Sequence, residues 1–300
     1  MKNLRTYLLA VLSCSLLASC IVDDEIDVND EYFNGPLVVG FKTDDNLGNF
    51  VEETGAQFDF DIPVHVIGGA SGQPAGSTIT MTYEIGTFAD LKISEGELAE
   101  LETMLDINNT PLDPSDDVRK YPIAVPGTHF DWVDTNLETT IPANATFDLI
   151  PIKVNNDALD NAKTTVFVVN LKTLVSVEDV VIAEQYESTL VRLQLCRTDL
   201  AGTYSVNYAT PANHTITHLG AGNYQLDSMF GWPGAGYTSF FYACAGNLIF
   251  TEWRFSNEII QGSPGYVDQA TGQIVFPEFG IGRASGPPIY SGSTWVLTLQ

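Results

Sequence analysis

The sequence contains few basic residues. It has 13 Lys and Arg residues against 38 Asp and Glu residues, which gives a formal net charge of −25 at pH 7. A protein that binds nucleic acid needs clustered Lys and Arg to displace the counterions of the phosphate backbone, whereas the basic residues here form no run. We therefore expect no nucleic-acid partner. The acidic charge favours solubility and repels anionic surfaces.

The sequence also lacks the short motifs of common active sites. It has no Gly-x-Ser-x-Gly elbow, no His-Glu-x-x-His, no phosphate-binding glycine loop and no zinc-type cysteine spacing. His214 and His218 would share one face of a strand, but at about 13 Å apart they are too distant to share a metal ion. We expect no cofactor, no metal and no enzymatic activity. A pair of glycosidase carboxylates would leave no motif, because such groups meet only in the folded chain.

No apolar run is long enough for a membrane-spanning helix, which needs about 20 residues. The run at 7–18 follows Lys2 and Arg5 and is typical of an export signal. It ends in Leu17-Ala18-Ser19-Cys20, which resembles a bacterial lipobox and implies that residues 1–19 are a signal peptide and that Cys20 carries the lipid. Several acyl chains would hold the protein at a membrane almost irreversibly. The alternative is an ordinary thiol beside a conventional cleavage site.

The acidic segment Ile21-Val22-Asp23-Asp24-Glu25 follows this cysteine. It resembles the export tag of surface-exposed lipoproteins of the Bacteroidetes type. The resemblance implies a protein that is lipid-anchored in the outer membrane and faces the cell exterior.

Two cysteines remain once the N-terminal segment is set aside. Cys14 falls in the signal peptide and Cys20 would take the lipid, which leaves Cys196 and Cys244. A disulfide between them is permitted in the cell envelope. Two buried free thiols in separate strands would give the same sequence, so both alternatives stay open.

The sequence predicts an all-β first domain over 36–196, after a flexible acidic tether at 20–35. The pattern is clearest at 78–85, where apolar and polar residues alternate with the period of a half-buried strand. A capping box at Ser94 and leucines at helical spacing predict a short helix over 95–105 within an insertion. The predicted strands of this domain are 37–41, 58–67, 78–85, 146–154, 164–171 and 187–195.

After Cys196 the strands become shorter and glycine and aromatic residues more frequent. We therefore predict a second all-β domain over 197–300, a small β-barrel or β-sandwich, since a chain of about 100 residues can bury an adequate core. Gly220-Ala221-Gly222-Asn223 indicates a hairpin. The predicted strands are 214–219, 224–229, 247–253, 273–276 and 294–299.

Four segments carry a family resemblance: Pro126-Gly127-Thr128-His129-Phe130, Thr140-Ile141-Pro142-Ala143-Asn144, Ile150-Pro151-Ile152-Lys153-Val154-Asn155-Asn156-Asp157 and Phe167-Val168-Val169-Asn170-Leu171. They resemble the second half of Calx-β-like, immunoglobulin-type domains, which implies an immunoglobulin-like β-sandwich for the first domain. Calcium-binding members of that family place acidic residues after the strand that corresponds to 150–154. Lys163 stands where an acid would be wanted, so the segment 155–163 fits a polar turn better than a calcium site.

The whole chain also resembles uncharacterised two-domain surface lipoproteins of the Bacteroidetes. Asp199-Leu200-Ala201-Gly202-Thr203-Tyr204 is similar to the start of their C-terminal domain. Many such proteins accompany glycan-uptake systems, and the resemblance implies that role here.

Aromatic residues are dense between 229 and 266. Most are expected in the core, with Phe240 and Tyr242 facing inward. Trp232 and Tyr237 lie in a glycine-rich segment typical of a loop, where an aromatic ring can stack on a sugar, and Trp253 and Tyr266 are further candidates for ligand contact.

These observations predict a non-enzymatic surface lipoprotein that binds a polysaccharide or glycoconjugate. Its partners would be the membrane, through the N-terminal lipid, and a glycan ligand. The main alternative is an adhesin or a structural partner of an outer-membrane protein complex, and a hydrolase is a weaker one. An exposed row of aromatic rings would favour the glycan, and a broad apolar patch a protein partner.

Overall fold

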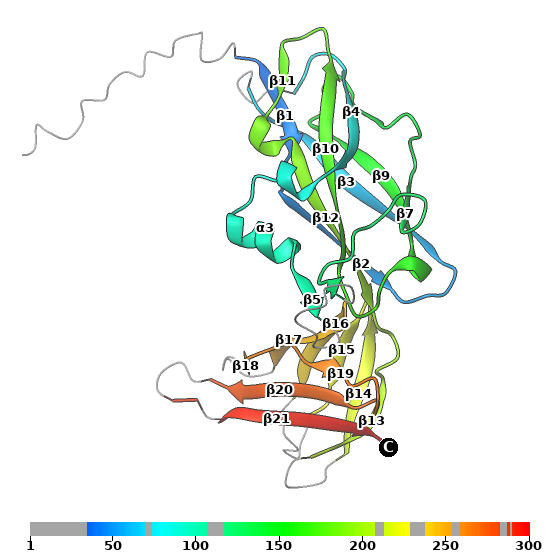
Figure 1. Cartoon of the computed structure of the whole chain (residues 1–300), viewed down its shortest axis with the longest axis vertical. Helices are drawn as coiled ribbons and strands as arrows, with labels where there is room; N and C mark the ends of the chain where they lie inside the picture. Colours follow the sequence, from blue (N-terminus) through cyan, green and yellow to red (C-terminus); the bar gives the residue numbers. More distant parts are fainter. Residues whose placement is uncertain are drawn as a thin grey trace, which may run out of the picture.

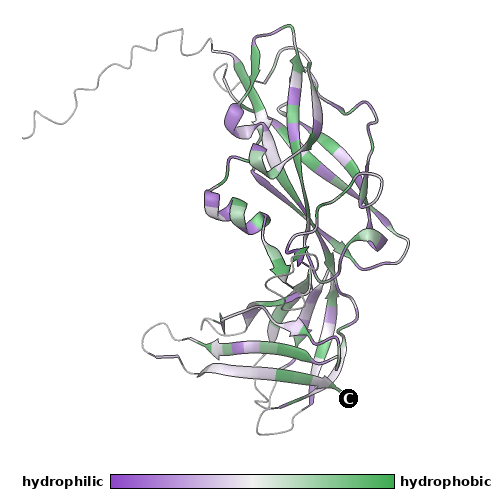
Figure 2. Ribbon diagram, in the orientation of Figure 1, coloured by the Kyte–Doolittle hydropathy of each residue, from purple (hydrophilic) through white to green (hydrophobic). Residues whose placement is uncertain are grey.

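The computed structural model has two all-β domains, one above the other in Figure 1. It describes residues 35–69, 74–106, 117–207, 213–228, 238–253, 259–282, 287–288 and 290–300. The predicted all-β fold class is confirmed. Hydrophobic and hydrophilic residues follow one another along the strands (Figure 2), as expected where one face of a strand is buried.

The first domain is a β-sandwich of two sheets. Its first sheet has five strands in the order β11 (Val180–Ile182), β1 (Leu37–Phe41), β3 (Gln57–Gly68), β9 (Phe147–Asn155) and β7 (Phe130–Trp132). Its second sheet has the order β2 (Asp45–Val51), β12 (Ser188–Cys196), β10 (Thr165–Val175), β4 (Ile79–Gly86) and β8 (Glu138–Ile141). Short 3-10 turns, η4 (Asn156–Ala158) and η5 (Glu184–Tyr186), follow β9 and β11.

The core of this domain lies between the two sheets. It includes Val39, Ile62, Ile152, Phe167 and Val191, each at most 1% exposed. Members of this cluster run along the chain from Leu37 to Leu195. The apolar surface that these residues remove from water contributes most of the favourable free energy of folding of this domain.

An insertion covers the outer face of the second sheet. It contains η2 (Phe88–Asp90), α3 (Glu95–Leu101) and a small hairpin of β5 (Met104–Asp106) and β6 (Asp117–Arg119). Leu91 and Leu101 pack there against Val166 and Val168 of β10. The predicted capping box is confirmed, because the Ser94 side chain accepts a hydrogen bond from the backbone of Glu97. The predicted helix end at 105 is wrong, since 104–106 form β5.

The second domain is an antiparallel barrel in which most strands pair with their neighbours along the chain. The strands are β13 (Gly202–Val206), β14 (Asn213–Gly220), β15 (Asn223–Leu226), β16 (Ser239–Cys244), β17 (Asn247–Trp253), β18 (Ile259–Gln261), β19 (Tyr266–Val267), β20 (Ile274–Ile281) and β21 (Tyr290–Leu299). β21 pairs with β13, and Leu248 exchanges two backbone hydrogen bonds with Gly265. These last contacts close the barrel between β17 and β19.

Aromatic side chains fill the barrel, with Tyr224, Phe241, Phe276, Phe279 and Trp295 all at most 1% exposed. The prediction that Phe240 and Tyr242 face inward is wrong. Both are only partly buried, whereas their neighbour Phe241 is buried. Because side chains alternate along a strand, the inward position of Phe241 directs Phe240 and Tyr242 to the outer face.

A disulfide links the two domains. Cys196 at the end of β12 pairs with Cys244 at the end of β16, and their Cα atoms lie 3.9 Å apart. Gly222 packs directly against this bond, since a Cβ there would lie 2.6 Å from Cys196 Cβ. Within the described residues, no helix has the length and apolar character needed to cross a bilayer.

Candidate binding site at the far end of the barrel

One end of the barrel faces the first domain and the other faces away from it. The near end carries the disulfide and Ala245, whose backbone N–H donates to Leu195 of the first domain. Along β16, Ser239 lies five residues from Cys244, which places it roughly 17 Å from that junction. Ser239 therefore marks an end of the barrel away from its junction with the sandwich.

Strand register gathers Ser239 and Trp253 at this far end. Ser239 is the first residue of β16, and it lies opposite Trp253, the last residue of β17. Directly opposed residues of antiparallel strands project from the same face, so both side chains face the barrel interior. Ser239 is fully buried, while Trp253 is only partly buried and packs on the barrel core.

His214 joins the same end from β14. Ile216 lies opposite Leu226, and Leu226 lies opposite Ser239, so His214 sits two residues further toward the end of the barrel. Its side chain is buried and faces the Trp295 ring, with ring centroids 6.3 Å apart.

Asp227 fixes the environment of this histidine. Its Oδ1 atom lies 3.4 Å from His214 Nδ1, near enough for electrostatic attraction. Burial lowers the pKa of His214, and the charge of Asp227 opposes that shift. The lowered pKa keeps the imidazole neutral at neutral pH.

Three buried polar atoms at this end have no hydrogen-bond partner among the described residues. One is Oδ1 of Asp227, which lies 3.4 Å from His214 Nδ1. The other two are Nε2 of His214 and Oγ of Ser239. Buried polar atoms are nearly always paired in folded proteins, and an unpaired one costs free energy. A ligand that brings hydroxyl groups to this end would satisfy the His214 and Ser239 atoms, and the Trp253 indole beside Ser239 offers an aromatic surface.

The four residues predicted to contact a ligand do not all lie at this end in the described part of the structure. Trp253 lies at the far end, as described. Tyr266 is 47% exposed and lies opposite Val275, near the start of β20. Val275 is roughly 20 Å from the last residue of that strand, Ile281. Trp232 and Tyr237 lie outside the described residues, as does Cys20. Ser228 and Thr238, the described residues on either side of the segment 229–237, lie next to the far end of the barrel.

Sequence reasoning missed Ser239 altogether and treated His214 only as a packed or solvated strand residue. The spacing of His214 and His218 correctly indicated a shared face, since His214 is buried and His218 partly so. Nothing in the sequence indicates that His214 and Ser239, on strands separated by β15, approach the same end.

The segment 155–163 includes η4 and is held by hydrogen bonds to the segment before β3. Within the described residues, no group of three or more His, Cys, Asp or Glu side chains is placed to hold a metal ion. Both carboxylate oxygens of Asp157 instead accept hydrogen bonds from the backbone N–H of Gly55, at 2.9 and 3.0 Å. Asp157 therefore has a structural role that fits the polar-turn alternative.

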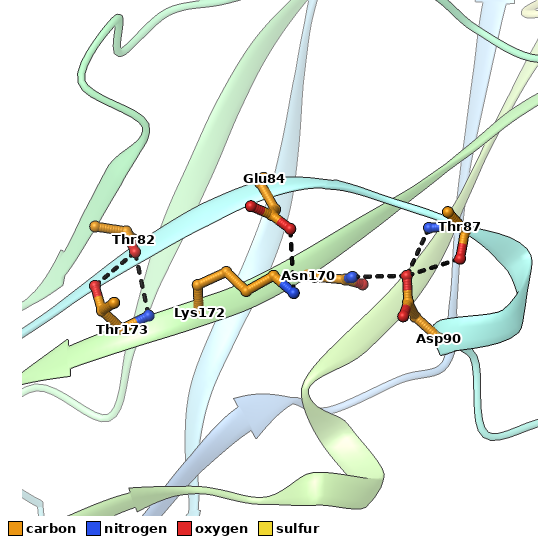
Figure 3. Close-up of polar contacts among 7 residues, drawn as sticks. All are labelled: Thr82, Glu84, Thr87, Asp90, Asn170, Lys172 and Thr173. Atoms are coloured by element: carbon orange, nitrogen blue, oxygen red, sulfur yellow. Dashed lines mark hydrogen bonds and ion pairs between the residues drawn. The ribbon is translucent and has the colours of Figure 1, made fainter.

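A second polar cluster fixes the insertion to the sandwich (Figure 3). Asp90 Oδ2 accepts hydrogen bonds from the backbone and hydroxyl of Thr87 and from Nδ2 of Asn170 in β10, at 2.7, 3.0 and 2.9 Å. These bonds, first of all that from the Thr87 backbone, lower the pKa of Asp90. The cluster explains the position of η2.

Comparisons with known proteins give only distant similarities. The chain matches no family model and no curated protein sequence. Among solved structures it is similar to a protein of unknown function from Bacteroides ovatus, at 12% identity over 90% of this chain and 91% of that one, with a TM-score of 0.35. A candidate carbohydrate-binding protein of Bacteroides ovatus ATCC 8483 shows 12% identity over 86% and 74%, with a TM-score of 0.34.

The CBD12 fragment of CALX1.2 is also similar, at 10% identity over 88% of this chain and 75% of that one, with a TM-score of 0.31. Similarities of this size support no conclusion about ligand or activity. Those conclusions depend on the residues described above.

Proposed function

We propose that this protein is a non-enzymatic surface lipoprotein that binds a polysaccharide or glycoconjugate at the far end of its C-terminal barrel. The main support is that His214 Nε2 and Ser239 Oγ, at the end where Trp253 lies, are buried and have no hydrogen-bond partner in the described part of the chain. Sugars combine hydroxyl groups with apolar ring faces. The hydroxyl groups complement the two polar atoms and the ring faces complement the indole.

The position of this end supports the same function. It lies away from the junction with the sandwich, whose first described residues, Gly35 and Pro36, follow the predicted tether. A lipid at Cys20 would thus hold the opposite part of the molecule at the membrane. Trp232 and Tyr237 stay predicted ligand contacts, because the chain between Ser228 and Thr238 starts and ends beside the proposed site.

Changing Trp253 to Ala is expected to weaken glycan binding about ten- to a hundredfold. The estimate takes aromatic stacking on nucleic-acid bases, about 1 to 3 kcal/mol per ring, as an analogue of stacking on sugars. The measurement is a glycan-array screen of the purified protein, followed by titration calorimetry with the best ligand. Tyr266→Ala is the matched control, since Tyr266 is an aromatic residue of the same barrel that lies far from the site. Equal affinities of Trp253→Ala and the wild type would contradict the proposed site.

Changing Cys20 to Ser is expected to release the protein from membrane fractions. No other segment of the sequence is predicted to hold it there, since the apolar run at 7–18 is too short to span a bilayer. The measurement is fractionation of cells that express each form, with Cys14→Ser as the control that leaves the lipid site intact. Retention of Cys20→Ser in the membrane fraction would refute the anchor.

A further inference from the structure

A row of three aromatic rings crosses the outer face of the first sheet. Gly40 of β1 lies opposite His65 of β3, and His65 lies opposite Phe147 of β9. Tyr186 of η5 lies over Gly40, since a Cβ at Gly40 would come within 2.7 Å of Tyr186 Cβ. The glycine therefore makes room for the tyrosine, and the order across the sheet is Tyr186, His65, Phe147. Figure 1 shows β1, β3 and β9 side by side in the upper domain.

Two rings of this row are exposed, and two lie close together. Phe147 is 49% exposed and Tyr186 is 38% exposed. The His65 and Phe147 rings lie 5.7 Å apart and are inclined by only 31°. The neighbouring strands β3 and β9 lie about 4.8 Å apart, so the His65 and Phe147 rings are offset by about the width of one pyranose ring. A row of exposed rings is the feature that favours a glycan over a protein partner.

A groove with polar groups accompanies the row. It has a volume of about 440 Å³ and is lined by Lys42, His65, Val66, Ile67, Thr146 and Tyr186. This volume falls within the range of small-molecule binding sites. Burial and the positive charge of Lys42 lower the pKa of His65, so its ring is neutral at neutral pH and fits an uncharged ligand.

Among the described residues, Lys42 forms no ion pair with an acidic side chain, whereas most other Lys and Arg side chains do. Six others do, namely Lys92, Lys120, Lys153, Lys172, Arg192 and Arg197. The three N–H donors of the Lys42 ammonium are therefore available to ligand oxygens. The net charge of −25 disfavours a polyanion as that ligand, and sugar hydroxyls remain the acceptors that fit.

We propose that the Tyr186–His65–Phe147 row, with Lys42, binds the interior of a neutral, extended polysaccharide chain. The rings support successive sugar faces while Lys42 and Thr146 bind their hydroxyl groups. This inference deepens the proposed function by adding a second site, on the other domain, and by naming the ligand class. A groove across the face of a sheet accommodates a continuing chain.

The test is affinity electrophoresis of the purified protein through gels that contain hydroxyethyl cellulose, xylan, glucomannan or laminarin. Carboxymethyl cellulose serves as the acidic counterpart on the same backbone as hydroxyethyl cellulose. We expect at least one neutral polymer to retard the wild type, and the acidic counterpart to retard it less. Tyr186→Ala and Phe147→Ala should each weaken that binding about tenfold, and the double variant should abolish the retardation.

Matched variants separate this site from general surface effects and from the barrel site. Leu47→Ala removes a 52% exposed apolar side chain elsewhere in the sandwich, and Lys172→Ala removes an exposed lysine that pairs with Glu84. Both should bind like the wild type, whereas Lys42→Ala should bind more weakly. Thermal unfolding of each variant confirms that it is folded.

The outcomes distinguish the two proposals. Loss of binding in the ring variants supports the row whatever Trp253→Ala does, and an effect of Trp253→Ala alone supports only the barrel site. Wild-type binding that the ring variants leave unchanged overturns the row. Failure of every neutral polymer to retard the wild type, or stronger binding to the acidic counterpart, overturns the assigned ligand class.

Discussion

Replacement of both Cys196 and Cys244 by Ala is expected to lower the free energy of unfolding by about 4 kcal/mol. The disulfide joins residues 48 apart in sequence, and closing a loop of that size removes much of the conformational freedom of the unfolded chain. Both cysteines are buried. The measurement is equilibrium urea denaturation of the double variant and the wild type under oxidising conditions.

Reduction provides the control for this prediction. Wild-type protein treated with a thiol reductant should lose a similar amount of stability, whereas the double variant should not respond to the reductant. If reduction did not increase the number of free thiols in the denatured wild type, the bond would not have formed. Equal stability of the double variant and the oxidised wild type would show that it contributes nothing. The far end of the barrel is roughly 17 Å from the bond, so the folded variant should keep its ligand affinity.

Six strands of the first domain could be predicted from the sequence, whereas β2, β7, β8 and β11 were not predicted. Predicted strands at 37–41 and 78–85 correspond to β1 (Leu37–Phe41) and β4 (Ile79–Gly86). These segments alternate apolar and polar residues, or are continuously apolar because both faces are covered, as β10 is. Such patterns depend only on local periodicity, which a single sequence displays.

The end of α3 could not be predicted, because a distant segment decides it. Leucines at helical spacing continue to Leu105, yet Leu105 pairs with Val118 in a hairpin. Its start was predictable, since the capping box at Ser94 is a local signal. The pairing of β5 with β6 therefore replaces the helix beyond Leu101, although the leucine pattern continues.

The sequence pattern of β16 also could not show which of its side chains face the barrel interior. Phe240, Phe241 and Tyr242 are consecutive aromatic residues, so hydrophobicity does not indicate which of them face inward. A shift of one residue in register exchanges the two faces of a strand. Pairing with β15, where Tyr224 lies opposite Phe241, fixes the inward choice.

The two candidate sites share this dependence on long-range register. His214 and Ser239 meet at one barrel end because β14, β15 and β16 pair in a particular order, and the ring row requires β1, β3 and β9 to lie together. Trp253 could be predicted as a candidate for ligand contact, because an aromatic residue at the end of a predicted strand is visible in the sequence without knowledge of strand pairing. The polar atoms that give each site its chemistry became visible only in the fold.

Trp295→Ala is expected to destabilise the barrel by about 3 to 5 kcal/mol. The indole is 1% exposed and lies at the centre of an aromatic cluster, with ring centroids 5.6 Å from Phe279, 5.9 Å from Phe276 and 6.3 Å from Phe250. Its removal loses the transfer free energy of a large side chain and leaves a cavity that the surrounding strands cannot fill completely. The loss is a large fraction of the 5 to 15 kcal/mol that holds a typical domain folded.

Urea denaturation at equilibrium measures this effect, with Tyr266→Ala as the control from the same barrel. Tyr266 is 47% exposed, so its truncation should change stability by about 0.5 kcal/mol or less. Trp295→Phe should recover part of the loss because it leaves a smaller cavity. Trp295 also packs beneath the proposed site through its contact with His214, so Trp295→Phe should weaken glycan binding less than Trp253→Ala. A Trp295→Ala variant as stable as Tyr266→Ala would show that the aromatic cluster does not form the barrel core.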